Sequence, residues 1–263
     1  EKKNEYLLED INATFNQIKL TSPLIKIIEQ KNIFLIQAKI ITNEKNFDKE
    51  LFKDLLGNNF KELDIENINF SSENNLNFNI SKKLKISNLK LKSKISLNTL
   101  DYKNELLNIK KYLPNFQETI KLQDHKILLN YKKNQLDING NGKLIIEDKI
   151  DSLNYKIRKK NDEYNFKTNI DLNKNSLLID ILNYKKKENL SSILKLSGKY
   201  KKDKHINFNS ILLNEDQNSF FINNLKLDNE FKIFDIDSVD LNYINQDQIQ
   251  NNIRLKKNKK DYQ

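Results

Sequence analysis

The chain has 263 residues, a net charge of +10 and no cysteine; 37% of its residues are hydrophobic and 31% are charged. The absence of cysteine excludes a disulfide framework, thiolate metal sites and a cysteine nucleophile. Hydrophobic residues are fewer than the usual share of about 45–50%. They nevertheless recur at every second position, which a disordered chain would not show. The composition therefore predicts a folded β-protein with a thin core, arranged as one large or two small domains.

The excess positive charge comes from lysine, because Arg158 and Arg254 are the only arginines. Recognition of bases and phosphates favours the planar guanidinium fork that lysine lacks. We therefore interpret the lysines as solvated outer faces of strands and expect no nucleic-acid partner. Attraction to anionic lipid head groups is the second interpretation.

The first part of the chain, residues 1–99, is predicted to be a β-rich segment with one short helix. Alternating residues predict strands over 9–20, 24–29 and 33–42, with a bulge near Asn16 and a break at Thr21-Ser22-Pro23. Over 46–56 the period changes to four residues, with Asn46 as the N-cap and Gly57 as the stop, which predicts a helix. Strand patterns resume after residue 62.

Residues 100–117 are predicted to form a helical or loop junction, because the alternation lapses there. Leu106, Ile109 and Leu113 have the spacing of a second short helix, and Pro114 ends it. Residues 118–263 are then predicted to form one continuous antiparallel β-meander, in which Leu177 to Tyr184 is one of the strands.

The clearest strand of this meander is Leu136–Ile146, which alternates strictly through two glycines. Gly140 and Gly142 share the apolar face with Leu136, Ile138, Leu144 and Ile146. They leave a gap among the apolar side chains, which permits a bend or the close approach of another group.

An apolar face of this length needs a cover, and two short helices cannot supply it. The sheet either closes on itself as a sandwich or barrel, or curls into a trough with an apolar lining. The thin apolar supply and the glycines favour the trough. The predicted fold is therefore mostly β, a long antiparallel meander curled into an open groove, with two short helices.

No catalytic or cofactor-binding pattern is found in the sequence. His125 and His205 are the only histidines and have no partner at metal-ligand spacing. No Gly-x-Ser-x-Gly, Walker or Gly-x-Gly-x-x-Gly motif occurs, and Asp235–Asp240 lacks the glycine and the glutamate of a calcium loop. We expect no enzyme activity, no metal and no cofactor.

Residues 110–263 also show a resemblance to a known protein family. The segments that carry it are Tyr112–Phe116, Asp124–Ile127, Tyr131–Asn134, Leu136–Leu144 and Leu153–Ile157. In strand rhythm and in scattered residues, the chain resembles the AsmA-like family of bacterial envelope proteins, which includes the very long YhdP and TamB types. The resemblance rests on no catalytic signature.

This resemblance implies a repeating β-groove in the periplasm that conducts phospholipids between the inner and outer membranes without catalysis. Its partners would be phospholipid acyl chains and components of both membranes. We interpret the chain as a piece of a longer protein, anchored to the inner membrane by a segment outside it. The same resemblance also allows an alternative role in inserting outer-membrane proteins.

The family offers no single-residue motif, so the expected lipid-binding lining comes from strand parity alone. Each of these residues is equally compatible with ordinary core packing. The lining residues are Leu136, Ile138, Leu144, Ile146, Tyr155, Ile157, Tyr164, Phe166, Ile170, Leu194, Leu196, Phe208, Leu225 and Leu227.

Two other classes of β-protein fit this sequence less well than the groove. An outer-membrane barrel would carry aromatic girdles at both ends of its strands, and this chain has no Trp and no such spacing. An adhesin-like structural surface protein would show a constant repeat length, which this sequence lacks.

Overall fold

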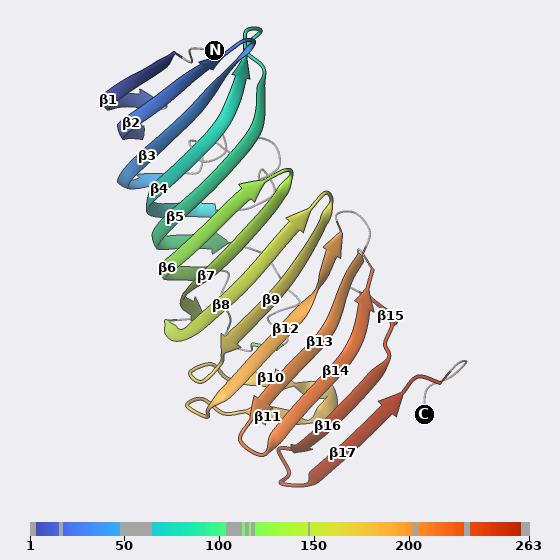
Figure 1. The fold of residues 1–263 in the computed structure, drawn as a ribbon. Coiled ribbons are helices and arrows are strands. Elements are labelled where there is room, and N and C mark those ends of the chain that lie inside the picture. Colours follow the sequence, from blue (N-terminus) through green and yellow to red (C-terminus); the bar gives the residue numbers. More distant parts are fainter. Residues whose placement is uncertain are drawn as a thin grey trace. The chain divides into compact units, whose positions relative to one another are not determined.

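The computed structural model describes residues 4–15, 18–47, 65–103, 112–113, 116, 119–146, 148–201, 205–228 and 232–258. Nearly all of these residues belong to antiparallel strands that follow one another in chain order (Figure 1). The prediction of an antiparallel β-meander is therefore confirmed.

The chain divides into two compact units. Unit 1 comprises residues 1–102 and 122–140, and unit 2 comprises residues 103–121 and 141–263. One boundary falls inside a strand, between Gly140 and Asn141, in the stretch whose two glycines interrupt the apolar pattern.

In unit 1 the strands pair in the order β1-β2-β3-β4-β5-β6-β7. Their bounds are β1 (Glu5–Phe15), β2 (Ile18–Gln30), β3 (Ile33–Phe47), β4 (Ile65–Ser81), β5 (Ile86–Lys103), β6 (Thr119–Lys132) and β7 (Gln135–Ile146). One end of each of β5, β6 and β7 belongs to unit 2.

In unit 2 the order continues as β7-β8-β9-β12-β13-β14-β16-β17, with the short β15 beside β14. The strands β10 and β11 form a separate two-stranded sheet. The bounds are β8 (Lys149–Lys160), β9 (Glu163–Asp171), β10 (Leu177–Ile179), β11 (Tyr184–Lys186), β12 (Ser192–Lys201), β13 (His205–Glu215), β14 (Asn218–Leu227), β15 (Ile233–Asp235), β16 (Ser238–Ile244) and β17 (Gln250–Lys256).

Each unit has a small hydrophobic core, as the composition predicts. The core of unit 1 consists of Ile18, Ile65, Ile68 and Leu97, with Phe70 and Tyr102 among the half-buried residues around it. Burying such a side chain contributes about 1.5–3 kcal/mol. Four buried residues are few for a sheet of this length, so much of the apolar surface of unit 1 stays partly exposed.

Asparagine and aspartate replace glycine in the tight turns. Lys133 and Asn134 both have positive φ (51° and 60°), which is the backbone of a type I′ hairpin turn between β6 and β7. Asn161 and Asp216 have positive φ in the β8–β9 and β13–β14 turns. Asparagine and aspartate tolerate the left-handed region because their short side chains can form hydrogen bonds with the local backbone.

The prediction of two short helices is not confirmed, because the described residues contain no α-helix. Asn46 and Phe47 belong to β3, and the rest of the predicted helix over 46–56 lies outside the described residues. The second predicted helix falls mostly on 104–111, also outside them, and Leu113 lies in a bend. Residues 100–103 extend β5 instead of starting a junction.

The predicted break at Thr21-Ser22-Pro23 is also wrong. β2 continues through Pro23 and absorbs it in a bulge, where the register with β3 shifts between Thr21 and Ile25. A bulge accommodates proline because the bulged residue donates no ladder hydrogen bond.

Candidate functional site

One face of the unit 2 sheet is apolar from strand to strand. Residues that pair directly across antiparallel strands point to the same face, so the register defines this surface. One row, for example, joins Ile157, Phe166, Gly198, Phe208 and Leu225. We call this surface the apolar face: Leu153, Tyr155, Ile157, Tyr164, Phe166, Thr168, Ile170, Leu194, Leu196, Gly198, Tyr200, Ile206, Phe208, Ile211, Leu213, Phe220, Ile222, Leu225, Leu227, Val239, Leu241, Ile253 and Leu255.

The structure brings together ten of the fourteen predicted lining residues on the apolar face. They are Tyr155, Ile157, Tyr164, Phe166, Ile170, Leu194, Leu196, Phe208, Leu225 and Leu227. Nine of them are half-buried and Leu225 is buried.

The other four predicted lining residues lie on β7, on both sides of the division. Leu136 and Ile138 are half-buried in unit 1. Leu144 and Ile146 belong to unit 2 and are only 7% and 5% exposed, so they are core residues there.

Aromatic rings are paired along the apolar face. The ring centroids of Phe166 and Phe208 are 5.7 Å apart, edge to face, and those of Tyr164 and Tyr200 are 5.9 Å apart. The Lys159 ammonium lies 5.0 Å from the centroid of the Tyr164 ring, a cation–π distance. Burial raises the pKa of the Tyr155 hydroxyl, so this group stays neutral.

A separate lobe covers one end of the apolar face. Residues 173–191, which we call the strap, leave the sheet after β9 and return at β12; they contain β10, the 3-10 helix η2 (Asp180–Leu182) and β11. The base of the strap is closed by two hydrogen bonds, from Leu172 N to Ser192 O and from Ser192 Oγ to Leu172 O.

The tip of the strap is tied to the β16–β17 turn. Asn183 Nδ2 donates to Asp247 Oδ2 at 2.7 Å, and the backbone and side-chain amides of Gln246 donate to the Asn183 oxygens at 2.9 Å. Since β9 and β12 hold one end and the β16–β17 turn holds the other, the strap crosses the face over β13, β14 and β16.

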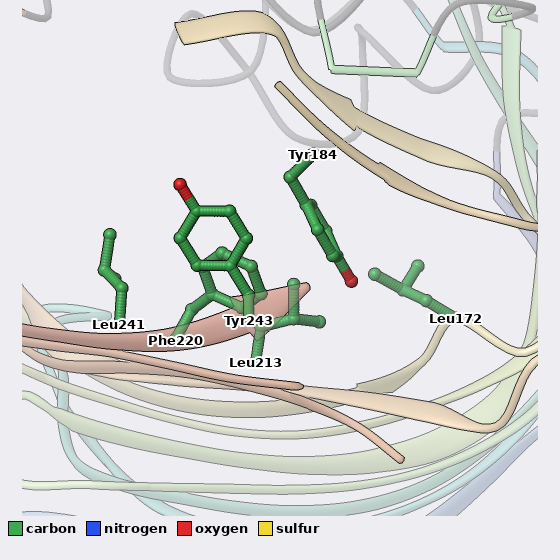
Figure 2. Close-up of a cluster of buried hydrophobic side chains, with 6 residues drawn as sticks. All are labelled: Leu172, Tyr184, Leu213, Phe220, Leu241 and Tyr243. Carbon is green, nitrogen blue, oxygen red and sulfur yellow. The ribbon is translucent and has the colours of Figure 1, made fainter. Parts of the chain in front are cut away.

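Under the strap lies the hydrophobic core of unit 2. Figure 2 shows Tyr184 of the strap against Leu213, Phe220, Leu241 and Tyr243 of the sheet. The Tyr184 ring is 4.6 Å from that of Phe220 and 5.8 Å from that of Tyr243. Such aromatic pairs add about 0.5–1.5 kcal/mol to the burial itself.

Two predicted lining residues belong to this core. Ile170 and Leu194 pack against the buried cluster. At this end of the face the apolar side chains are therefore covered by the chain itself. The remaining half-buried lining residues lie outside the cluster.

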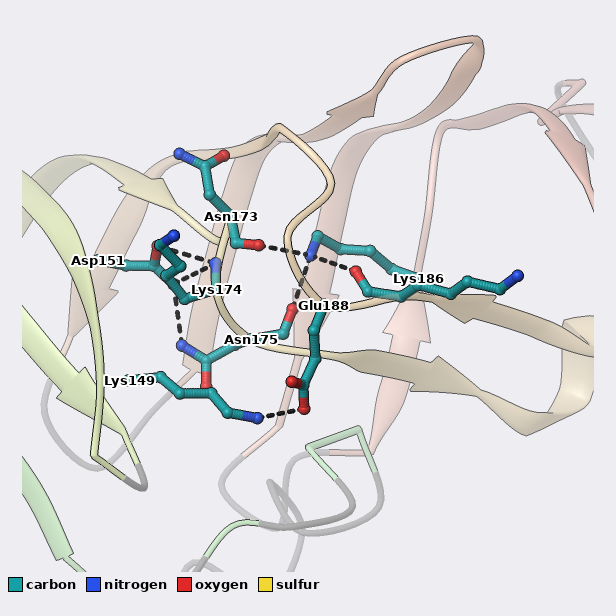
Figure 3. A network of polar contacts seen from close by, with 8 residues as sticks. Lys149, Asp151, Asn173, Lys174, Asn175, Lys186 and Glu188 are labelled. Carbon is teal, nitrogen blue, oxygen red and sulfur yellow. Dashed lines mark hydrogen bonds and ion pairs between the residues drawn. The ribbon is translucent and has the colours of Figure 1, made fainter.

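A buried lysine holds the strap in shape. Lys186 is fully buried, and its Nζ donates to the carbonyl oxygens of Asn175 (2.6 Å), Lys187 (2.9 Å) and Asn173 (3.4 Å), as Figure 3 shows. Burial lowers the pKa of Lys186, while Asp151 and Glu188 partly offset this effect. Three carbonyl oxygens replace the water that a buried ammonium loses.

Asp151 of β8 anchors the first part of the strap to the sheet. Its carboxylate accepts the backbone N–H of Lys174 at 3.1 Å and the side-chain amide of Asn175 at 2.9 Å. Lys149 forms an ion pair with Glu188 at the other side of the same loop (Figure 3). Sequence reasoning missed these residues, because an Asp at the start of a strand and a Lys in a lysine-rich chain carry no distinctive pattern.

The row beside the base of the strap contains a buried carboxyl group. Glu215 is 4% exposed and pairs with Ser192 and Asn218. Burial raises the pKa of Glu215 and neighbouring Asp216 adds to the effect, while a hydrogen bond from Asn218 opposes it. Glu215 Oε2 and the Tyr184 hydroxyl have no hydrogen-bond partner within the described part of the chain.

The described residues contain no group of three or more His, Cys, Asp or Glu side chains that could hold a metal ion. His125, one of the two histidines examined as ligands, is buried at 1% exposure, and His205 is exposed at the start of β13. Within the same residues, no helix combines the length and hydropathy that crossing a membrane requires.

Comparison of the chain with protein-family models, with curated proteins and with solved structures gives no match.

Proposed function

We propose that the apolar face binds the acyl chains of phospholipids, and that the chain is a non-catalytic segment of a lipid-conducting β-groove in the bacterial periplasm. The observation that carries the proposal is the half-buried state of seven side chains of that face. These residues are Tyr155, Ile157, Tyr164, Phe166, Leu196, Phe208 and Leu227.

The chemistry of this surface suits a sliding hydrocarbon chain. Burial of methylene groups contributes about 0.8 kcal/mol each and has no directional requirement. A row of similar apolar side chains therefore offers many nearly equal positions and no single tight site. The paired rings of Tyr164 and Tyr200 suit the edge of a lipid-binding surface, since a tyrosine keeps its hydroxyl in water while its ring contacts lipid.

The strap limits the part of the face that a lipid would use in this proposal. Tyr184 already packs on Phe220 and Tyr243, so that end is occupied. The acyl chain would lie between β8 and β14, over the row that runs from Ile157 to Leu225.

The wider role follows from the resemblance to AsmA-like proteins. In that role the meander curls into an open groove, further segments continue it, and an anchor in the inner membrane lies outside this chain. The lysines on the opposite face meet water and anionic head groups. The alternatives are a structural surface protein and a module for outer-membrane protein insertion. The following experiment distinguishes them from lipid binding.

The test compares phospholipid bound to the chain after purification from bacterial envelopes, measured by mass spectrometry. We expect the unaltered chain to carry phospholipid and Ile157→Asp to carry much less, because an acyl chain over this row would remove water from the carboxylate at a high cost in free energy. Lys156→Asp, one residue away on the opposite face, is the matched control and should keep its lipid.

A lipid-free chain would contradict the proposal and favour a structural role. Far-UV circular dichroism checks that Ile157→Asp still folds. Ile157→Ser is the milder variant if it does not. If both variants unfold, Ile157 is a core residue and the face is a packed interior.

A further inference from the structure

A second candidate site lies in unit 1, on the polar face of its sheet. The register places Lys26, Gln37, Asn77 and Lys90 in one row across β2 to β5. The next row contains Lys39, Asn75 and Lys92. The apolar pair Ala38 and Leu76 separates these two rows along β3 and β4.

The surface is hollowed over these two rows. The hollow has a volume of about 580 Å³, and the seven residues line it together with the apolar Pro23, Leu24, Ala38 and Leu76. Pro23 and Leu24 belong to the bulge in β2. The bulge therefore supplies one wall of the hollow, and the rows from β3 to β5 supply its floor and its opposite side. We call it the lysine hollow.

Positive charge exceeds negative charge in the lysine hollow. Lys26 pairs with Glu5 at 2.7 Å and Lys39 pairs with Glu73 at 3.1 Å. Lys90 and Lys92 have no acidic partner among the described residues. Since they are two residues apart on one strand, their stems start about 6.7 Å from each other and can reach the same anion.

Amide groups complete the polar lining. The side chains of Gln37, Asn75 and Asn77 have no hydrogen-bond partner within the described residues. An amide donates as well as accepts, so these groups suit the hydroxyls of a polar molecule. Ammonium groups act as compact charges toward phosphate, and the bulge at Leu24 offers an apolar contact for carbon atoms.

We propose that the lysine hollow binds a phosphate ester with neighbouring hydroxyl groups. Lys90 and Lys92 bind the phosphate, and Gln37, Asn75 and Asn77 bind the hydroxyls. The same chemistry occurs in the head group of an anionic glycerophospholipid and in a free polyol phosphate. The inference does not depend on lipid binding at the apolar face, which lies in unit 2.

The test measures binding of glycerol 3-phosphate to the whole chain by calorimetry and amide NMR. We expect saturable binding with shifts at Lys90 and Lys92. Lys90→Gln/Lys92→Gln should lower the affinity about tenfold or more, because two charged hydrogen bonds are lost. Asn77→Ala keeps every charge and should still lower the affinity about fivefold.

The matched control is Lys156→Gln/Lys167→Gln in unit 2. These lysines face each other across β8 and β9 on a polar face, also without an acidic partner among the described residues, and lie outside the lysine hollow. Their loss should change the affinity less than about twofold. Equal losses in both double variants, or no effect of Asn77→Ala, would mean diffuse attraction and would overturn the proposal.

A second arm identifies the source of the phosphate. Vesicles of phosphatidylcholine and phosphatidylglycerol in equal amounts are tested for binding by flotation. Binding that requires Lys90 and Lys92 assigns the hollow to a lipid head group. Glycerol 3-phosphate binding without vesicle binding assigns it to a free ester. Binding to neither probe would refute the site.

Discussion

Gly198 is the residue where the sheet of unit 2 tolerates no side chain. A Cβ at this position would lie 2.4 Å from the Asn207 carbonyl oxygen and 2.7 Å from Cζ of Phe166. The register between β12 and β13 shifts at the same place, between Ser197 and Gly198. The Phe166 ring thus occupies the space that the glycine leaves in the apolar face.

We predict that Gly198→Ala lowers the free energy of unfolding by about 1–3 kcal/mol, the usual cost of overpacking. One of the two close contacts is a backbone oxygen, which cannot move without loosening the β12–β13 ladder. Urea unfolding followed by circular dichroism measures the change. Lys195→Ala, on the exposed face of the same strand, should stay within about 0.5 kcal/mol of the unaltered chain. A fully stable Gly198→Ala would show that the bulge opens freely.

The strap is the element where sequence-based prediction fails. Leu177 to Tyr184 has the apolar content of a strand, and its sequence predicts one. In the structure this run contains β10, η2 and the first residue of β11, and it reverses at Asn183, whose φ is 47°. The reversal has a local hydrogen bond from Asn183 N to Asp180 O, and Asn183 also contacts the β16–β17 turn, more than 60 residues away. A local pattern contains no information about such contacts.

The strands, by contrast, were largely predictable, because a two-residue period on a one-sided sheet is a local property. The shared face of residues as distant as Ile157 and Leu225 followed from parity alone. Parity could not show which of these residues a second layer covers. Ile170 and Leu194 therefore have the same sequence signature as Phe208 but pack into the core.

Beside the strap, we predict that Glu215 of β13 makes the free energy of unfolding depend on pH. Burial raises the pKa of this carboxyl in the folded state, so its stabilising contribution is complete below the pKa of an unfolded Glu. The contribution is lost as the pH rises through the raised pKa. Glu215→Gln stays neutral, so it should be more stable than the unaltered chain at pH 7, with the difference vanishing near about pH 4.

Unfolding free energies across this pH range measure the effect. Amide exchange at Leu178, whose N–H donates to Tyr112 O at 2.8 Å, reports on the strap itself. Asn209→Ala, at an exposed position of β13, is the control: it changes no titratable group, so its difference should not vary with pH. A constant difference for Glu215→Gln as well would show that the carboxyl is solvated beside the strap.

For the whole chain, the net charge of +10 means that repulsion between lysines opposes the stabilisation from ion pairs. Lys156 and Lys167 face each other directly, and Lys199 pairs with Glu163 at 3.5 Å. At Asp235, hydrogen bonds from Lys226 and Lys257 lower the carboxyl pKa to about 2. Exposed ion pairs contribute about 0–1 kcal/mol each, so repulsion should dominate.

We therefore predict that salt stabilises the protein. Raising ionic strength from about 0.01 M to 0.15 M shortens the screening length from about 30 Å to 8 Å. This weakens the long-range repulsion of a strongly basic chain more than it weakens contacts of 3 Å. The thermal midpoint of the unaltered chain should therefore rise with salt. Lys167→Glu lowers the net charge by two and places an acid opposite Lys156, so salt should raise the midpoint of this variant less. A midpoint that falls with salt would show that ion pairs outweigh repulsion in this fold.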